Sequence, residues 1–456
     1  MIFHQLKKIW SSAVVMNWGA LSSRLVVLFF VWPLALKNLS TNELAIWALF
    51  STVFSLQVIV DSSLADALTR LVAQKSDSEL FHQVVGTVRS IFSKVCLIVF
   101  VLLCIFGTLS VKRLVLQSSQ IVLAWISWGV VVSGFMVSLF SNQYVVLIGG
   151  LNHVVNVKRI DFLTGFGAAF LTTLFLALGG GLLSLVFSTQ LGAFVRYLLL
   201  KNEFVKIEKN RSLDQNRFIK SEAMSREVWP MLWKGWLGVL FTFGLTQLSG
   251  IFYAQVASAK DVAAYLIALR FAQMISVFSL PPFDTKIPLL AKLYPKKCFE
   301  EMRSIFTTAM QRSYWVFVLG FIVVTVLIPN AFKFLNKDFE FVNLNVWALM
   351  GLGFFLERYS NMHLQLYTLS NHVLWHVSSF VFGTLYVLFC IFLFPNFGVI
   401  AFPLSFCLGQ IIFSIGFSAK KSYGIYGHSI PMYELKTFFP PLITLLLFLG
   451  FFLWVT

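Results

Sequence analysis

Three arginines lie near the middle of long apolar segments, where a cation is costly. They are Arg24, Arg270 and Arg358. A charged side chain at the centre of a bilayer costs about 3 kcal/mol on insertion scales, so such residues normally face a polar interior. The planar guanidinium group binds carboxylates and phosphates through paired, charge-assisted hydrogen bonds. The three arginines therefore predict a binding site for an anion at membrane depth.

Neutral polar residues accompany each arginine at helical spacing. These companions are Asn17 before Arg24, Gln273 after Arg270, and Asn361 and Gln365 after Arg358. Residues at such spacings share one face of a helix, so we expect the companions to line the same cavity as the arginines. The alternative is that each arginine is a structural ion-pair partner or extends to the membrane surface.

Acidic residues are fewer in the apolar segments. Asp61, Asp66 and Glu357 are the candidates for ion coupling or for salt bridges that gate a pathway. Solvation at a helix end is the commoner role of such carboxyl groups. The residues alone select none of the three as a coupling group.

Metal and nucleotide chemistry have little support. His372 and His376 are spaced as a zinc-binding pair could be, but no third ligand stands at a suitable spacing. The chain has no G-x-x-x-x-G-K-[ST] motif for binding ATP phosphates. We therefore expect no metal site and no cofactor.

The composition places most of the chain in a membrane. Of its 456 residues, 58% are hydrophobic and 12% are charged. A soluble fold could not bury so much apolar surface, so lipid must surround most of it. The net charge of +16 would suggest nucleic acid as a partner of a soluble protein, but in a membrane protein it reflects Lys and Arg retained in cytoplasmic loops. We expect membrane lipids as partners and no nucleic acid.

Thirteen apolar runs are long enough to cross a bilayer core of about 30 Å. They cover residues 13–36, 43–65, 91–110, 121–148, 160–178, 182–200, 232–256, 262–283, 312–332, 345–367, 374–394, 398–417 and 439–455. The last run is either an extra span or a helix at the interface. With the N-terminus inside, the alternate loops hold 22 Lys and Arg residues and the opposite loops hold six. This asymmetry predicts a cytoplasmic N-terminus.

The sequence repeats weakly at an offset of 218 residues. Residues 40–47 correspond to residues 258–265, and each stretch begins with Ser-x-x-acid, a capping box that opens the second helix of its half. The repeat predicts an all-α polytopic membrane protein of two six-helix bundles, with 12 spans and an extra C-terminal helix. The expected parts are a half at 1–200, a basic cytoplasmic linker at 201–228, a half at 229–418 and a C-terminal segment at 419–456.

These features resemble the MOP superfamily. Within it the chain is similar to the bacterial polysaccharide flippases, the Wzx-type translocases of O-antigen or capsule repeat units. Residues 17–70, including the stretch 39–47, carry most of the likeness, and the pattern of spans extends it to about residue 418. Members often have Tyr-Gly or Phe-Gly after the acid, where this chain has Leu44 and Ala45.

The resemblance implies a carrier that moves a lipid-linked oligosaccharide, usually on undecaprenyl diphosphate, to the outer leaflet of the bacterial inner membrane by alternating access. In the related peptidoglycan lipid flippases, arginines on helices 1, 2 and 8 serve the diphosphate. Arg24 and Arg270 match the positions on helices 1 and 8, whereas Arg70 lies at the inner end of helix 2. Arg358 is then expected to supply the third charge. A polysaccharide polymerase is a candidate partner.

Two other functions, those of an antiporter and of a membrane enzyme, fit the sequence less well than flipping does. A MATE-type antiporter of drugs or cations needs buried carboxylates, but the charges in the middle of the spans are mainly arginines. A membrane polymerase or glycosyltransferase needs catalytic residues outside the bilayer, and each external loop has only about ten residues or fewer. We therefore expect a transporter rather than an enzyme.

Overall fold

The computed structural model is helical in all its regular secondary structure, within the residues it describes. It describes the whole chain except residues 1–22, 24–25, 56, 58–63, 66–67, 70, 74, 76–79, 119, 211–219, 295, 336–340, 371–373, 427–429 and 456. Contacts divide the chain into two compact units. Unit 1 is Met1–Trp236 with Gly250–Ala263, and unit 2 is Leu237–Ser249 with Ala264–Thr456. The boundary thus falls inside the helices that connect the two units.

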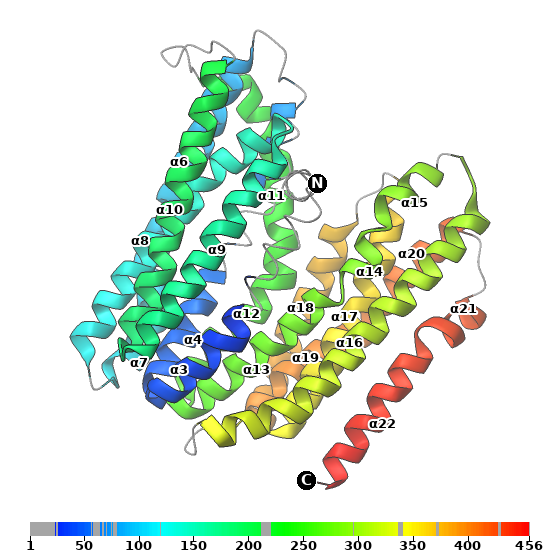
Figure 1. Cartoon of the computed structure of the whole chain (residues 1–456). Helices are drawn as coiled ribbons and strands as arrows, with labels where there is room; N and C mark the ends of the chain where they lie inside the picture. Colours follow the sequence, from blue (N-terminus) through cyan, green and yellow to red (C-terminus); the bar gives the residue numbers. More distant parts are fainter. Residues whose placement is uncertain are drawn as a thin grey trace, which may run out of the picture. The chain divides into compact units, whose positions relative to one another are not determined.

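The first unit is built mainly from long helices that run side by side (Figure 1). Its α-helices are α3 (Trp32–Asn38), α4 (Thr41–Ser55), α6 (Phe81–Leu102), α7 (Thr108–Leu116), α8 (Ile121–Gly150), α9 (Val154–Ala177), α10 (Gly181–Asn210) and α11 (Glu222–Val239), the last of which ends in unit 2. The π-helical turns η1 (Val27–Val31) and η2 (Leu103–Gly107) precede α3 and join α6 to α7. Helix α10 packs along both α8 and α9, so these three helices form the centre of the unit.

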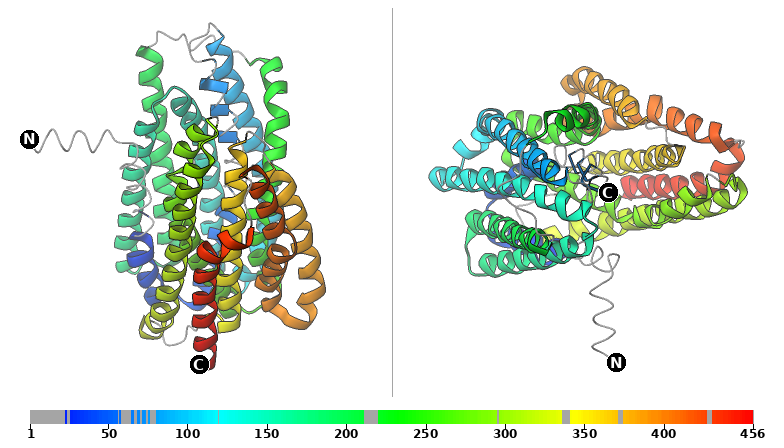
Figure 2. Two further views of the ribbon diagram at one scale, coloured as in Figure 1. Left: turned by 90° about the vertical axis from the view of Figure 1, so that its right-hand side faces the viewer. Right: turned by 90° about the horizontal axis from the view of Figure 1, so that it is seen from above.

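The second unit is also helical, and its long helices are seen from another side in Figure 2. The chain reaches it through α12 (Leu245–Val256) and α13 (Ala259–Phe278), which both cross the boundary. Its other elements are η4 (Leu240–Gly244), α14 (Pro281–Asp284), α15 (Ile287–Leu293), α16 (Phe299–Leu335), α17 (Leu344–Thr368), α18 (Trp375–Phe397), η5 (Gly398–Ile400), α19 (Ala401–Gly409), η6 (Gln410–Ser414), α20 (Ile415–Tyr426), α21 (Ile430–Thr437) and α22 (Phe439–Val455). Helix α17 lies inside, packed by α16, α19, α20 and α22.

Seven helical stretches in the described residues are long and apolar enough to cross a membrane. They are Phe81–Leu116, Ile121–Gly150, Val154–Ala177, Gly181–Lys209, Ala259–Asp284, Phe299–Leu327 and Trp375–Gly424, with a shorter apolar helix at Phe439–Trp454. All eight overlap runs that the sequence marks as apolar. The helices extend past those runs because turns with charged residues, such as the end of α10, continue a helix without being apolar. The protein is a multi-pass, all-helical membrane protein.

Helix α17 is not among these seven stretches, although it has 25 residues. Its second half carries Glu357, Arg358, Asn361 and Gln365, which lower its mean hydropathy. Most of its residues are buried inside unit 2, so neighbouring helices rather than lipid surround it. A buried helix can hold polar residues that a lipid-facing helix could not.

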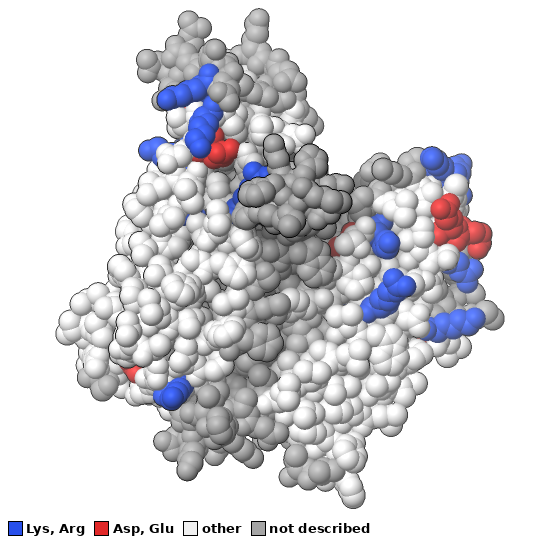
Figure 3. All heavy atoms as spheres, in the orientation of Figure 1, with Lys and Arg blue, Asp and Glu red and all other residues white. Residues whose placement is uncertain are grey.

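Lys and Arg side chains gather towards one end of each unit (Figure 3). Exposed lysines lie in the last third of α10 in unit 1 (Lys201, Lys206 and Lys209) and in the middle of α20 in unit 2 (Lys420 and Lys421). The surfaces between the ends carry few charges in this view. This distribution is typical of helices whose middle parts lie in lipid and whose ends lie in water.

Both predicted capping boxes are confirmed. The Glu43 carboxylate accepts hydrogen bonds from the Ser40 backbone N–H (2.9 Å) and hydroxyl (2.9 Å), and the Ser40 hydroxyl accepts one from the Glu43 N–H (3.3 Å). At the start of α13 the Asp261 N–H donates to the Ser258 hydroxyl (3.2 Å), which donates to the Asp261 carboxylate (2.6 Å). Each box satisfies backbone N–H groups that the helix itself leaves free.

Removing either capping hydroxyl should destabilise the protein. We expect Ser40→Ala and Ser258→Ala each to cost about 1 kcal/mol, the usual effect of losing an N-cap acceptor. The measurement is the midpoint of thermal unfolding of the purified protein. Ser93→Ala is the control, because the Ser93 hydroxyl is exposed and bonds only back to the Arg89 carbonyl within α6. An equal loss of stability in the control would contradict the capping role.

The turn between α9 and α10 is made by three consecutive glycines, Gly179, Gly180 and Gly181. Gly179 and Gly181 have φ angles of 84° and 60°, a region that other residues rarely adopt. The turn therefore joins α9 and α10 as an antiparallel pair, in which residues equally far from the turn lie opposite each other.

Candidate functional site

The stretch Ala259–Asp284, which contains α13 and α14, is the most buried of the seven apolar stretches. In its most apolar part 72% of the residues are buried, whereas the other stretches reach at most 39%. Residues 262–269 are all buried. The second half of the helix has one open face, on which Arg270, Gln273, Met274 and Val277 lie half-buried or exposed. These positions follow the i, i+3, i+4, i+7 spacing of a single helix face. Two polar residues expected from the sequence therefore share one open face of an otherwise inner helix.

The Arg270 side chain is half-buried, and its Nη2 atom is fully shielded with no hydrogen-bond partner among the described residues. No hydrogen bond or ion pair links the guanidinium to any described residue. A guanidinium has five N–H donors, and leaving them unsatisfied in a shielded place is costly. Arg270 is thus a cation whose donors are available to an anion.

On α17, three polar residues form a stripe at i, i+4 and i+8. Glu357, Asn361 and Gln365 are half-buried, while nearly every other residue from 353 to 366 is buried. The Asn361 side chain interacts with the Glu357 carboxyl group. The sequence placed Arg358 rather than Glu357 at the head of this stripe. In the structure Glu357 lies on the open face instead, because Arg358 is the next residue along the helix and its side chain points towards α13.

Arg358 is buried, with 3% of its surface exposed, and it is bound within unit 2. Its Nη2 atom donates to the Ser276 carbonyl oxygen (2.7 Å) and to the Ser276 hydroxyl (2.9 Å) on α13. Glu357 and Asp284 both act on it electrostatically. Arg358 therefore links α17 to α13 at a point six residues after Arg270, which is about 9 Å along the helix axis.

Asp284, at the end of α14, belongs to the same group of charges. Its carboxyl group interacts with Arg358 and with the side chain of Gln365. Gln365 is therefore engaged with an acid of its own unit. From the sequence, Asp284 is a charge near the inner end of a span, for which a gating salt bridge is possible and solvation at the helix end is the commoner role. Its place beside Arg358 could not be predicted, because a single helix pattern does not indicate which helices pack together.

A small polar cavity lies beside the α17 stripe. It is lined by Ser360, Asn361, Leu364, Trp375, Ser378, Ser379, Phe382, Gln410 and Ser414. The Ser360 hydroxyl donates to the Gln410 side-chain oxygen (3.1 Å), so α17 and the π-helical turn η6 are joined across it. Hydroxyl and amide groups dominate the lining, and none of these residues is charged.

Six residues discussed in the sequence analysis lie outside the described part of the chain. They are Asn17, Arg24, Asp61, Asp66, Arg70 and His372. The described site residues thus all belong to unit 2.

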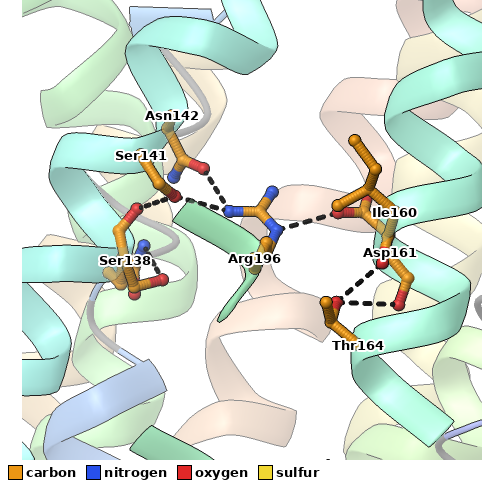
Figure 4. A network of polar contacts seen from close by, with 8 residues as sticks. Ser138, Ser141, Asn142, Ile160, Asp161, Thr164 and Arg196 are labelled. Carbon is orange, nitrogen blue, oxygen red and sulfur yellow. Dashed lines mark hydrogen bonds and ion pairs between the residues drawn. The ribbon is translucent and has the colours of Figure 1, made fainter. Parts of the chain in front are cut away.

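Unit 1 contains a polar network that sequence reasoning missed (Figure 4). The Arg196 Nε atom on α10 donates to the Asp161 carboxylate on α9 (2.8 Å). Its Nη1 atom donates to the Ser141 hydroxyl (2.7 Å) and to the Asn142 side-chain oxygen (3.0 Å) on α8. Arg196 and Asp161 are only 21% and 23% exposed. One guanidinium thus ties together the three central helices of the unit.

The position of the glycine turn in the sequence indicates the contact between Asp161 and Arg196. Asp161 lies 19 residues before Gly180 and Arg196 lies 16 residues after it, so the antiparallel pairing of α9 and α10 places them near each other. Asn156 and Glu203, which lie at 24 and 23 residues from the same glycine, are also hydrogen-bonded (2.7 Å). Comparing distances from the turn would have identified both contacts.

Breaking this ion pair should destabilise unit 1. Asp161→Asn leaves a half-buried guanidinium without its acid, so we expect a loss of about 1–3 kcal/mol, seen as a lower midpoint of thermal unfolding. The double variant Asp161→Asn/Arg196→Gln should lose less than the sum of the single variants, because neither charge is then left alone. Additive losses in this double-mutant cycle would contradict the pairing.

Comparisons with known proteins agree with this architecture. A family model described as "Polysaccharide biosynthesis protein" matches residues 39–294.

An inward-facing multidrug resistance MATE family transporter of the MOP superfamily is 13% identical, with a TM-score of 0.69 over 91% of this chain and 96% of that chain. The lipid II flippase MurJ in an inward closed conformation is 12% identical, with a TM-score of 0.64 over 96% and 98% of the two chains. The outward-facing form of a MATE family transporter has a TM-score of 0.60 at 12% identity, over 92% and 99%. No curated protein sequence matches significantly. The predicted MOP-superfamily fold is confirmed.

Proposed function

Because the chain belongs to the polysaccharide biosynthesis protein family, we propose that it flips a lipid-linked oligosaccharide from the cytoplasmic to the outer leaflet of the inner membrane. The carrier lipid of this proposal is undecaprenyl diphosphate. The observation that carries it is Arg270, whose shielded Nη2 atom has no hydrogen-bond partner among the described residues and which lies on the open face of an inner helix. A diphosphate offers the oxygen acceptors and negative charge that such a guanidinium binds best.

The proposed roles differ between the arginines. Arg270 binds the diphosphate, Arg24 is a second candidate for the same role, and Gln273, Asn361 and Gln365 supply polar lining. Arg358 is already bound to Ser276 and lies among acids, so we assign it to positioning α13 rather than to direct contact. Glu357 on the open stripe, Asp61 and Asp66 stay candidates for ion coupling.

The proposed architecture is that of an alternating-access carrier. It has twelve spans in two six-helix halves, with α22 as a thirteenth helix and the N-terminus in the cytoplasm. Two capping boxes at equivalent places in the sequence repeat support this arrangement. The likeness in fold to a lipid II flippase is compatible with a lipid-linked cargo.

Glycan export in cells tests this function. In a strain that lacks the gene, the wild-type protein should restore surface polysaccharide, and its absence should leave lipid-linked oligosaccharide in the inner leaflet. Wild-type expression should give no proton- or sodium-driven efflux of cationic dyes, which a multidrug antiporter would produce. Dye efflux together with unchanged surface polysaccharide in the deletion strain would overturn the proposal.

A further inference from the structure

The small polar cavity beside the α17 stripe lies between three elements of unit 2. They are α17, the first two turns of α18 and the π-helical turn η6. The volume of the cavity is about 10 Å³, which admits one water-sized group. Of its nine lining residues, six carry a hydroxyl or an amide group, and three are apolar, namely Leu364, Trp375 and Phe382. The cavity therefore fits a single small polar group.

Two of the lining residues reach the surface of the protein. Asn361 and Trp375 are half-buried, whereas the other seven lining residues are at most 5% exposed. Asn361 also belongs to the half-buried stripe of α17, between Glu357 and Gln365. The polar cavity thus adjoins the open face of α17 that we assign to the substrate.

Three buried side chains present polar atoms to the cavity. Gln410 and Ser414 begin and end η6, and Ser378 lies in the first turn of α18. The Gln410 side-chain oxygen accepts a hydrogen bond from the Ser360 hydroxyl (3.1 Å), so its amide nitrogen is the group left to donate. This nitrogen and the hydroxyls of Ser378 and Ser414 make no hydrogen bond with a described residue. Buried polar groups normally have a partner, so these three indicate a place for a polar ligand.

Close packing holds the walls of the cavity in place. A Cβ atom at Gly409, just before η6, would lie 3.0 Å from the Phe382 ring, so α18 approaches α19 closely at this point. Phe382 also packs against Phe406 of α19, with ring centroids 5.4 Å apart. A π-helical turn such as η6 is rare and is frequently found at functional sites. The polar groups are therefore ordered before a ligand binds, which lowers the cost of binding.

From this arrangement we propose that the polar cavity binds one hydroxyl group of a neutral sugar ring that packs against Trp375. This inference rests on the proposed function and assigns a site to the oligosaccharide part of the substrate. A hydroxyl group both donates and accepts hydrogen bonds, so it can serve the Gln410 nitrogen and a serine hydroxyl together. The Trp375 indole offers apolar surface for the C–H groups of the ring.

A neutral group suits the cavity better than an ion. None of its lining residues is charged. An ion would therefore lose its hydration there without meeting an opposite charge. The diphosphate is accordingly assigned to Arg270 and the sugar to the polar cavity, so that charge and sugar are bound by different residues.

The direct test is saturation-transfer NMR of the free repeat-unit oligosaccharide with the purified full chain in lipid nanodiscs. Mild acid releases this oligosaccharide from its lipid, so the probe lacks the diphosphate. The wild type should transfer saturation to the sugar protons, and Gln410→Leu should bind the sugar about tenfold more weakly. If Gln410→Leu does not fold, Ser414→Ala replaces it and should bind roughly threefold more weakly.

The matched control for this binding test is Ser418→Ala. The Ser418 hydroxyl bonds to the Ile415 carbonyl oxygen (3.2 Å) within α20 and does not line the cavity, so its loss should leave sugar binding unchanged. Arg270→Gln should also bind the free sugar like the wild type. No transfer from the wild type beyond that of empty nanodiscs, or equal transfer in Gln410→Leu, overturns the proposal and leaves the cavity as a site for water only.

Flipping in liposomes separates this inference from the proposed function. The two cargoes are undecaprenyl diphosphate with and without the oligosaccharide. Gln410→Leu should flip the glycosylated lipid about tenfold more slowly than the wild type and the bare lipid at the wild-type rate, whereas Arg270→Gln should slow both. Equal slowing of both lipids by Gln410→Leu overturns the sugar site alone. Failure of the wild type to flip either lipid contradicts the proposed function, and the NMR measurement then decides whether the cavity binds sugar.

Discussion

Replacing Arg270 with Gln should reduce transport of the lipid-linked oligosaccharide by about ten- to a hundredfold. Charge-assisted hydrogen bonds contribute about 1.5–3 kcal/mol, and the donors of Arg270 have no partner in the described residues that would compete for them. Transport by Arg270→Lys should lie between that of the wild type and that of Arg270→Gln, because lysine keeps the charge but lacks the planar pair of donors. The measurement is the amount of surface polysaccharide formed per unit of protein in the membrane.

The same substitution should not lower stability. The shielded Arg270 Nη2 atom has no partner among the described residues, which is costly to the folded protein, so Arg270→Gln should unfold at the same temperature as the wild type or a higher one. Arg312→Gln is the matched control, because it removes an exposed arginine from α16 of the same unit. It should leave transport unchanged. Loss of transport accompanied by an equal loss of folded protein would contradict a binding role for Arg270.

Replacing Arg358 with Met should cause a large loss of stability, in contrast to Arg270→Gln. The substitution removes the Arg358 donor from the Ser276 hydroxyl and carbonyl oxygen, of which the carbonyl keeps a bond from the Ser279 hydroxyl, and it leaves Glu357 and Asp284 without their cation. Removing one partner of a buried charged pair typically costs about 3–5 kcal/mol. We expect a lower midpoint of thermal unfolding and less protein in the membrane, with transport per folded molecule reduced less than in Arg270→Gln.

A compensating variant separates charge from packing at this position. Glu357→Gln in the Arg358→Met background removes the acid that acts most strongly on Arg358, so it should recover part of the lost stability. Glu357→Gln alone should be the milder change. If Arg358→Met unfolds like the wild type yet abolishes transport, Arg358 contacts the substrate instead.

The sequence was sufficient to predict most of the long helices and the capping boxes that begin α4 and α13. Apolar runs such as 121–148 and 345–367 coincide with α8 and α17, because a helix that crosses or lies within the membrane must be long and largely apolar. The capping boxes at Ser40 and Ser258 were also predictable, since all their hydrogen bonds are local. The ends of α10 and α16 were not predictable, because these helices continue through charged turns that lie outside the apolar runs.

Contacts between helices were harder to predict. Helical spacing placed Arg358 with Asn361 and Gln365, but it could not show that Ser276 on α13 would take up the guanidinium. Likewise, Arg196 was one charge in an apolar run until α8 and α9 brought Asn142 and Asp161 to it. Periodicity within one helix identifies a polar face, whereas the partner of each residue depends on tertiary packing.

The central claim is that the protein moves a diphosphate-linked lipid across the bilayer with Arg270 as a binding group. The most direct measurement is flipping of a fluorescent undecaprenyl diphosphate oligosaccharide by the purified protein in liposomes, followed by its accessibility in each leaflet. The wild type should flip this lipid faster than its monophosphate analogue, and Arg270→Gln should remove the difference. Equal rates for wild-type and protein-free liposomes, or an unchanged preference in Arg270→Gln, would contradict it.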